Sequence, residues 1–297
     1  MIDAFVPVRT PYRLDLTAAV LRRLSTNVVD VYADGAYRRL LDDAGGPTGL
    51  LVRQQAADVL SVRIEGPCAE RYNPAALVRR MLGTEVVLDA FERGVRTVPW
   101  LHEIARGARG ARPPRYPSLW ETIVNAVVYQ QVSIHAAGAI LRRVIERYAP
   151  AHEVDGHTLR AFPVPQVFLD ADPAELRALG LSINKVTALR VLARAVADGE
   201  LDEDALARLE TPALLDALVV HRGIGRWTAA VVALRGFGRL DVFPMGDSGA
   251  AAALRALSGE HETGLDALLA ALAPQQGMLY YHLLMGRLAA RGEITLA

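Results

Sequence analysis

The chain has 297 residues, of which 52% are hydrophobic and 22% are charged, and its 33 basic residues balance 33 acidic ones. This composition is typical of a globular protein with a sizeable core in two or three domains, and it excludes an intrinsically disordered chain. Arg, Asp or Glu interrupts every long apolar run, so we expect no membrane association. The first residues, MIDAFVPVRTPYRLDL, lack the basic start and apolar run of a secretory signal, and we expect a cytoplasmic protein.

Two scarce residue types narrow the chemistry further. Lys185 is the only lysine, so phosphate contacts would have to come from arginines and backbone amides. Cys68 is the only cysteine, which excludes an intrachain disulfide, a cysteine-based zinc site and a four-cysteine iron–sulfur cluster. We expect Cys68 to be a small apolar residue, and we expect no metal site.

The first part of the chain combines strand-like and helical patterns. Residues 12–24 alternate before they turn helical, and residues 49–66 are strand-like. Asp34-Gly35 separates two further strand-like runs, and this dipeptide favours a two-residue hairpin turn. We predict a small α+β domain over residues 1–85.

Beyond Asn73-Pro74 the spacing of apolar residues becomes helical. Asp172-Pro173 has the pattern of a cap followed by proline at the first helical position, and residues 107–117 form a Pro/Gly/Arg-rich connector. We predict a mainly α protein with an N-terminal α+β domain and an all-helical region over 86–297. The predicted helical segments are 74–95, 118–149, 172–180, 184–199, 211–221, 226–237, 249–257 and 278–291.

The stretch HRGIGRWTAA, residues 221–230, places Gly223 and Gly225 between two of these helices. Glycines allow positive φ and a close approach of the backbone to a ligand. A helix that starts near Arg226 directs free amides into the turn, and these amides together with the helix dipole suit a DNA phosphate. Taken alone, Gly-x-Gly between helices is more often a plain tight turn, so both interpretations stay open.

An aspartate follows this turn in the sequence and precedes the next predicted helix. Asp247 stands 22 residues after Gly225, after Pro-Met-Gly and before Ser-Gly-Ala-Ala, which is the pattern of a helix N-cap. A carboxylate beside a phosphate-binding turn would also suit a reacting sugar, so a cap and a catalytic group are the two alternatives.

Residues 223–247, GIGRWTAAVVALRGFGRLDVFPMGD, resemble the helix-hairpin-helix Gly/Pro…Asp superfamily of DNA glycosylases, and GIGRWTA is similar to its AlkA-type 3-methyladenine DNA glycosylase II branch. Residues 176–202 and 123–144 resemble segments of that branch, and the N-terminal region resembles its accessory domain. The resemblance covers nearly the whole chain. It implies the helix-hairpin-helix DNA glycosylase fold and a monomer that acts on double-stranded DNA with alkylated bases.

The resemblance also implies a mechanism. Such an enzyme flips a nucleotide out of the duplex and breaks its glycosidic bond through an oxocarbenium-like sugar. Asp247 matches the catalytic position, and we expect Asp241 to be structural. Trp227 stands where bifunctional members carry a Schiff-base lysine, and Lys185 lies in a different segment. The resemblance therefore implies a monofunctional glycosylase without lyase activity.

The remaining candidate site residues rest on weaker sequence signals. Gln131 matches the wedge that fills the gap left by a flipped base, and His135 could reach phosphate, although a solvated helix end and a structural histidine are alternatives. The candidate base-pocket residues are Trp227, Tyr129, Trp120, Tyr280 and Tyr281, and each aromatic could instead be core. The candidate DNA-binding residues are Arg222, Gly223, Gly225, Arg226, Thr228, Gln130, Gln131 and Ser133, with Arg142 and Arg143 as additional basic groups.

Three departures leave the substrate open. Arg222 replaces the usual hairpin proline, Val231 stands where a relative has a pocket tyrosine, and residues 273–284 lack tryptophan. The alternatives are a glycosylase for hypoxanthine, uracil or 1-methyladenine, and a non-catalytic DNA-binding protein, against which the intact Asp247 argues. We expect no cofactor, and the sequence leaves open whether a monovalent cation sits in the hairpin.

Overall fold

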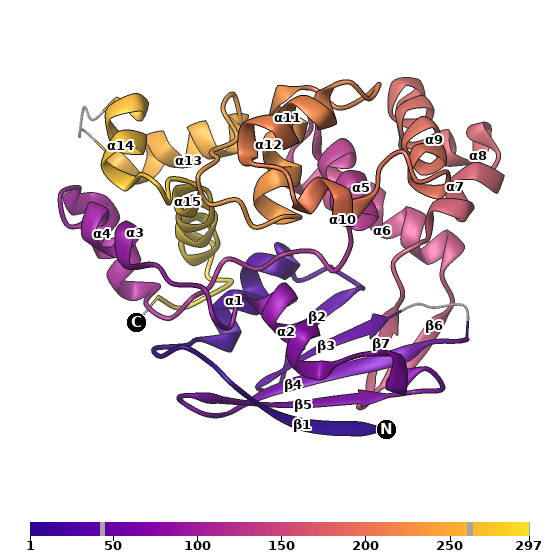
Figure 1. Ribbon diagram of the computed structural model, residues 1–297, viewed down its shortest axis with the longest axis horizontal. Helices are drawn as coiled ribbons and strands as arrows, with labels where there is room; N and C mark the ends of the chain where they lie inside the picture. Colours follow the sequence, from indigo (N-terminus) through magenta and orange to yellow (C-terminus); the bar gives the residue numbers. More distant parts are fainter. Residues whose placement is uncertain (42–44, 260–263, 297) are drawn as a thin grey trace.

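The computed structural model describes residues 1–41, 45–259 and 264–296. An antiparallel sheet forms one end of the molecule, and most helices lie to one side of it (Figure 1). The predicted class, mainly α with an N-terminal α+β unit, is confirmed. Within the described ranges, no helix combines the length and the apolar character that a bilayer crossing needs.

The N-terminal unit is a five-stranded antiparallel sheet in the order β1-β5-β4-β3-β2, and α1 and α2 pack against it. Asp34 and Gly35 both have positive φ and connect β2 to β3, which confirms the predicted hairpin. Asn73 caps α2 through the amide of Ala76, as its position before Pro74 predicts. The elements are β1 (Ile2–Pro7), α1 (Leu14–Arg22), β2 (Asp30–Ala33), β3 (Ala36–Leu41), β4 (Thr48–Ala56), β5 (Val59–Glu65), the 3₁₀ helix η1 (Ala69–Arg71) and α2 (Pro74–Leu82).

The rest of the described chain is mostly helical. Two helices run through the interior: nearly every residue of α5 is buried, and α12 is buried from its third residue onward. The helices are α3 (Asp89–Val95), α4 (Pro99–Gly107), α5 (Leu119–Tyr129), α6 (Ile134–Tyr148), α7 (Pro165–Asp170), α8 (Pro173–Ala178), α9 (Ile183–Ala197), α10 (Glu203–Ala207), α11 (Thr211–Val219), α12 (Arg226–Arg235), α13 (Ser248–Ser258), α14 (Leu265–Leu272) and α15 (Gly277–Ala290).

One element corrects the prediction that residues 86–297 are all-helical. β6 (Ala151–Val154) and β7 (His157–Arg160) form a hairpin that packs against β3 of the N-terminal sheet. Its turn is Asp155-Gly156, with both residues at positive φ, which is the same signal that marks the β2–β3 turn. Buried Leu159 packs against Leu40, so the hairpin ties the helical region to the sheet.

A buried ionic cluster makes a second tie between the sheet and the helices. Arg39 of β3 pairs with Asp30 at 2.7 Å and with Glu121 of α5, and the Tyr37 hydroxyl donates to Asp30 at 2.7 Å. Burial raises the pKa of Glu121 to about 7, because one guanidinium faces two carboxyl groups away from water. The N-terminal unit is therefore fixed against α5, whose C-terminal end reaches the cavity described next.

Candidate active site

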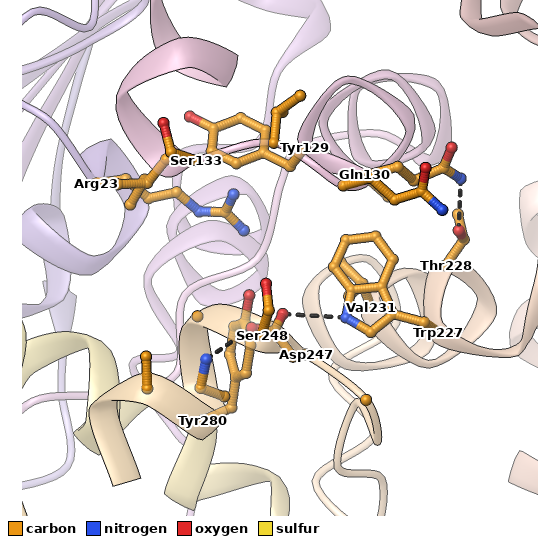
Figure 2. Close-up of a pocket in the computed structure, with 18 of the residues that line it drawn as sticks. Arg23, Tyr129, Gln130, Ser133, Trp227, Thr228, Val231, Asp247, Ser248 and Tyr280 are labelled. Carbon is orange, nitrogen blue, oxygen red and sulfur yellow. Dashed lines mark hydrogen bonds between the residues drawn. The ribbon is translucent and has the colours of Figure 1, made fainter. Parts of the chain in front are cut away.

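A cavity of about 1160 Å³ opens where the C-terminal end of α5 meets the N-terminal ends of α9, α12 and α13 and one face of α15. Figure 2 shows side chains from α5, α12, α13 and α15 around the same hollow. Helix N-termini carry unpaired amides and partial positive charge. With the start of α6, four helix N-termini surround this cavity, which makes it suited to a polyanionic ligand.

Asp247 forms part of the cavity wall and is also the N-cap of α13. Its Oδ1 accepts a hydrogen bond from the Ala250 amide at 2.7 Å, and its Oδ2 accepts one from the indole Nε1 of Trp227 at 3.0 Å (Figure 2). The cap predicted from sequence is confirmed. The cap and the cavity are not alternatives, because the same carboxylate is held by both oxygens and still lines the hollow.

Trp227 is half-buried and stands in the first turn of α12, directly after the hairpin. Its ring lines the cavity and also packs against the core between α5 and α12. An indole N–H only donates, so it pairs with a carboxylate oxygen, which accepts. The tryptophan therefore orients Asp247 as well as lining the cavity.

The two hairpin glycines have different structural reasons. Gly223 has a φ of 96°, and a Cβ there would lie 2.5 Å from the Cβ of Ala188, so the turn itself requires glycine. Gly225 has a φ of −88° and no atom within 4 Å of an added Cβ, so the fold does not require glycine at this position. Gly225 is exposed at the N-cap of α12, no side chain caps that helix, and Arg222 and Arg226 flank it in solvent.

Comparison with known proteins agrees with this geometry. Residues 124–272, half of the chain, match the family model described as HhH-GPD superfamily base excision DNA repair protein. This chain belongs to the HhH-GPD superfamily. It is 30% identical over 249 residues to a Mycobacterium tuberculosis protein described as a probable bifunctional transcriptional activator/DNA repair enzyme AlkA, a match that covers 82% of this chain and 48% of that protein.

Two further proteins show how far the similarity extends. DNA-3-methyladenine glycosylase 2 of Escherichia coli is 36% identical over 134 residues, which cover 45% of this chain and 46% of that protein. A solved 3-methyladenine DNA-glycosylase from Archaeoglobus fulgidus has a TM-score of 0.78 at 22% identity, over 97% of this chain and 99% of that one, and thus shows the fold. The chain spans about half the length of the curated relatives it matches.

In this HhH-GPD chain, two residues expected to contact DNA hold the hairpin in place. The side-chain amide of Gln130 donates to the carbonyl of Gly223 at 3.0 Å and to the hydroxyl of Thr228 at 2.8 Å. Thr228 is buried, so its hydroxyl is turned to Gln130 and away from solvent. These contacts fasten the end of α5 to the hairpin. Both residues also line the cavity, so the DNA contact expected of them stays a prediction.

The residues after Gln130 are better placed to meet a duplex. Gln131 is exposed, lines the cavity and has a φ of 55°, at the turn between α5 and α6. Ser133 is exposed and caps α6 through the amide of Ala136. His135 also lines the cavity, and its Nε2 lies 2.8 Å from Nη1 of Arg291 on α15. Arg142 and Arg143 lie further along α6 and do not line the cavity.

Three of the five aromatic residues predicted for the base pocket line the cavity, and two do not. Tyr129 and Tyr280 line the cavity with Trp227 (Figure 2). The prediction is wrong for Trp120, whose indole donates to the carbonyl of Pro163 while its ring packs edge-on against Phe168. It is also wrong for Tyr281 of α15, which is 1% exposed and packs in the hydrophobic core. Both rings therefore pack in the hydrophobic core and do not line the cavity.

Lys185 and Arg23 are among the cavity residues that the sequence did not indicate. Lys185, near the start of α9, donates to the carbonyls of Val128 and Gln130 at 2.8 and 2.9 Å, and burial lowers its pKa. Arg23 reaches the cavity from the end of α1 in the N-terminal unit. A lysine that caps a distant helix leaves no local signal, and an arginine contributed by another domain leaves none either. Val231 lines the wall with a small aliphatic side chain.

Proposed function

We propose that this protein is a monofunctional DNA glycosylase that flips alkylated purines out of double-stranded DNA and excises them, leaving an abasic site. The observation that carries the proposal is the Asp247 carboxylate, fixed through both oxygens in the wall of a cavity large enough for a base, beside a glycine hairpin with free amides. The relatives named as DNA-3-methyladenine glycosylases support the same reaction.

The reaction is a hydrolysis at the sugar. The C1′–N9 bond breaks and its electron pair leaves with the base, so positive charge develops on C1′ and the ring oxygen. The negative charge of Asp247 lowers the energy of that transition state, and the same carboxylate can orient the attacking water. An alkylated purine that carries positive charge in the nucleotide leaves as a neutral base. Water then supplies hydroxide to C1′, and its remaining proton is released to solvent. Trp227 keeps the carboxylate directed at the cavity throughout.

DNA is bound chiefly through its backbone. The free amides at the start of α12, with Arg222 and Arg226 beside them, suit a phosphate next to the flipped nucleotide. Gln131, exposed on a sharp turn, would enter the gap that the base leaves. We propose that the protein acts as a cytoplasmic monomer and that this hydrolysis needs no cofactor.

The absence of lyase activity is part of the proposal. A lyase step needs an amine that attacks C1′. Trp227 stands at the position where the resemblance places that amine, and it has none to offer. Lys185 does line the cavity, but its ammonium group is already directed at the two carbonyls that end α5.

A base-release assay on a panel of duplexes tests the function. The panel carries 3-methyladenine-type lesions, 1-methyladenine, hypoxanthine and uracil, and abasic sites are revealed by strand breakage in hot alkali. We expect release of alkylated purines, with strands that stay intact until alkali is added. Binding to every duplex without release of any base would instead support a non-catalytic DNA-binding protein.

A further inference from the structure

Arg23 belongs to the N-terminal unit, yet it forms part of the cavity wall. It follows the last residue of α1, is 7% exposed and lines the cavity with Tyr129 and Tyr280. Its Cζ lies 4.5 Å from the centroid of the Tyr129 ring. In Figure 2 its guanidinium projects into the hollow that Tyr129, Tyr280 and Asp247 surround. The accessory domain thus places a cation inside the candidate base pocket.

The backbone at this position is strained in a way that aims the side chain. Arg23 has φ 63° and ψ −47°, and the Leu24 amide donates to the Arg22 carbonyl at 2.8 Å. This is a γ-turn of the rare, strained hand. The surroundings hold it: the Asn27 side chain donates to the Arg22 carbonyl at 3.0 Å, and Leu24 packs against Gly138 of α6. Strain maintained by so many contacts is characteristic of functional positions.

The positive charge of Arg23 has no carboxylate partner among the described residues. Among the described residues no acidic side chain forms an ion pair with it, whereas Arg39, which is also buried, pairs with two. Guanidinium stays protonated in proteins and can only donate. Its guanidinium lies over the Tyr129 ring and also hydrogen-bonds the Tyr129 side chain. Because a guanidinium carries five N–H donors, further donors remain for a guest in the cavity.

A guest purine exposes either an acceptor or a donor at C6. Guanine-type bases present the carbonyl O6, whereas adenine-type bases present an amino group that donates. A guanidinium pairs well with O6 and meets an amino group donor to donor. We infer that Arg23 is a specificity-determining residue, which makes the cavity favour a flipped purine with a carbonyl at C6 over one with an amino group there. This inference rests on the proposed function.

Methylated DNA provides a test in one reaction. It contains 3-methylguanine and 3-methyladenine, which carry the methyl group at the same ring position and differ at C6. The released bases are separated by chromatography, and their ratio is measured for the unaltered protein, Arg23→Gln and the control Arg22→Gln. Arg22 precedes Arg23 on α1 but does not line the cavity, and its side chain contacts the Tyr32 carbonyl.

We expect Arg23→Gln to lower the ratio of 3-methylguanine to 3-methyladenine by about tenfold, the size of one lost bidentate contact, and Arg22→Gln to leave the ratio unchanged. Because both bases compete in one reaction, a partly unfolded variant releases less of each without changing the ratio. Arg23→Lys keeps the charge but not the planar fork, and we expect it to lower the ratio by about threefold.

The outcomes separate the two proposals. Release of both bases at an unchanged ratio by Arg23→Gln, or by Arg23→Lys where the glutamine variant does not fold, overturns the role of Arg23 and leaves the glycosylase function intact. Release of neither base by the unaltered protein overturns the proposed function, and the inference falls with it.

Discussion

Alanine at Gly225 should weaken DNA binding without weakening the fold, whereas alanine at Gly223 should weaken both. At Gly223 the new Cβ would lie 2.5 Å from the Ala188 Cβ, and alanine would have to adopt a φ of 96°. Overpacking and backbone strain each cost about 1–3 kcal/mol. At about 2–4 °C per kcal/mol we expect the Tm of Gly223→Ala to fall by about 5 °C or more.

Gly225→Ala meets neither obstacle. Its φ of −88° suits any residue and nothing lies within 4 Å of the added Cβ. The gain of about 0.4–1 kcal/mol from lower chain entropy offsets the weaker N-cap preference of alanine, so the stability of the fold should stay nearly unchanged. The added methyl group instead stands between the α12 amides and a phosphate. Loss of one charge-assisted hydrogen bond, worth about 1.5–3 kcal/mol, raises Kd about tenfold to a hundredfold.

Fluorescence anisotropy with an undamaged and an abasic duplex, at one fixed salt concentration, measures the affinity, and thermal unfolding measures the fold. Gly264→Ala is the matched control, because Gly264 is also a helix N-cap with open space around it but lies outside the cavity. Wild-type affinity in Gly225→Ala would refute the reasoning and leave the hairpin as a plain turn.

Three further predictions address the carboxylates and the amine. Trp227→Phe keeps an aromatic ring but removes the hydrogen bond to Asp247. We expect single-turnover base release to be about tenfold slower, with unchanged affinity for abasic DNA. An unchanged rate would show that the indole N–H does not orient the carboxylate. Burial raises the pKa of Glu121 from 4.5 to about 7. Between these two pH values the folded state retains a proton that the unfolded state loses. The stability that this proton confers is therefore lost as pH rises from about 4.5 to 7. Glu121→Gln should therefore gain Tm relative to the unaltered protein across that window, whereas a constant difference at every pH would contradict the shift. Borohydride should trap no covalent adduct with damaged DNA, and an adduct lost in Lys185→Arg would show that this amine reaches C1′.

Features that depend on neighbouring residues could be predicted from the sequence. The Asp34-Gly35 turn, the Asn73 cap and the Asp247 cap follow from side-chain chemistry within a few residues, and the structure confirms each. The β6–β7 hairpin carries the same Asp-Gly signal at residues 155 and 156, but its strands are short and lie between helical runs.

Features that depend on distant packing could not be predicted. Trp120 and Tyr281 are aromatic like Tyr129, and only the direction of the helix face decides which ring meets the core and which the cavity. Arg23 reaches its place because the buried Arg39 cluster fixes the N-terminal unit against α5. Residue type gives no indication of either outcome.

The central claim is that the negative charge of Asp247 promotes base release. Asp247→Asn removes this charge alone, since asparagine is also a good N-cap and should keep α13 in place. The measurement is single-turnover release of 3-methylated purines, with the affinity for an abasic duplex determined on the same samples. We expect release to slow by about 10²–10³-fold or more, while the affinity for abasic DNA stays within about threefold. Release at the wild-type rate would contradict the central claim, because the carboxylate would then be only a helix cap.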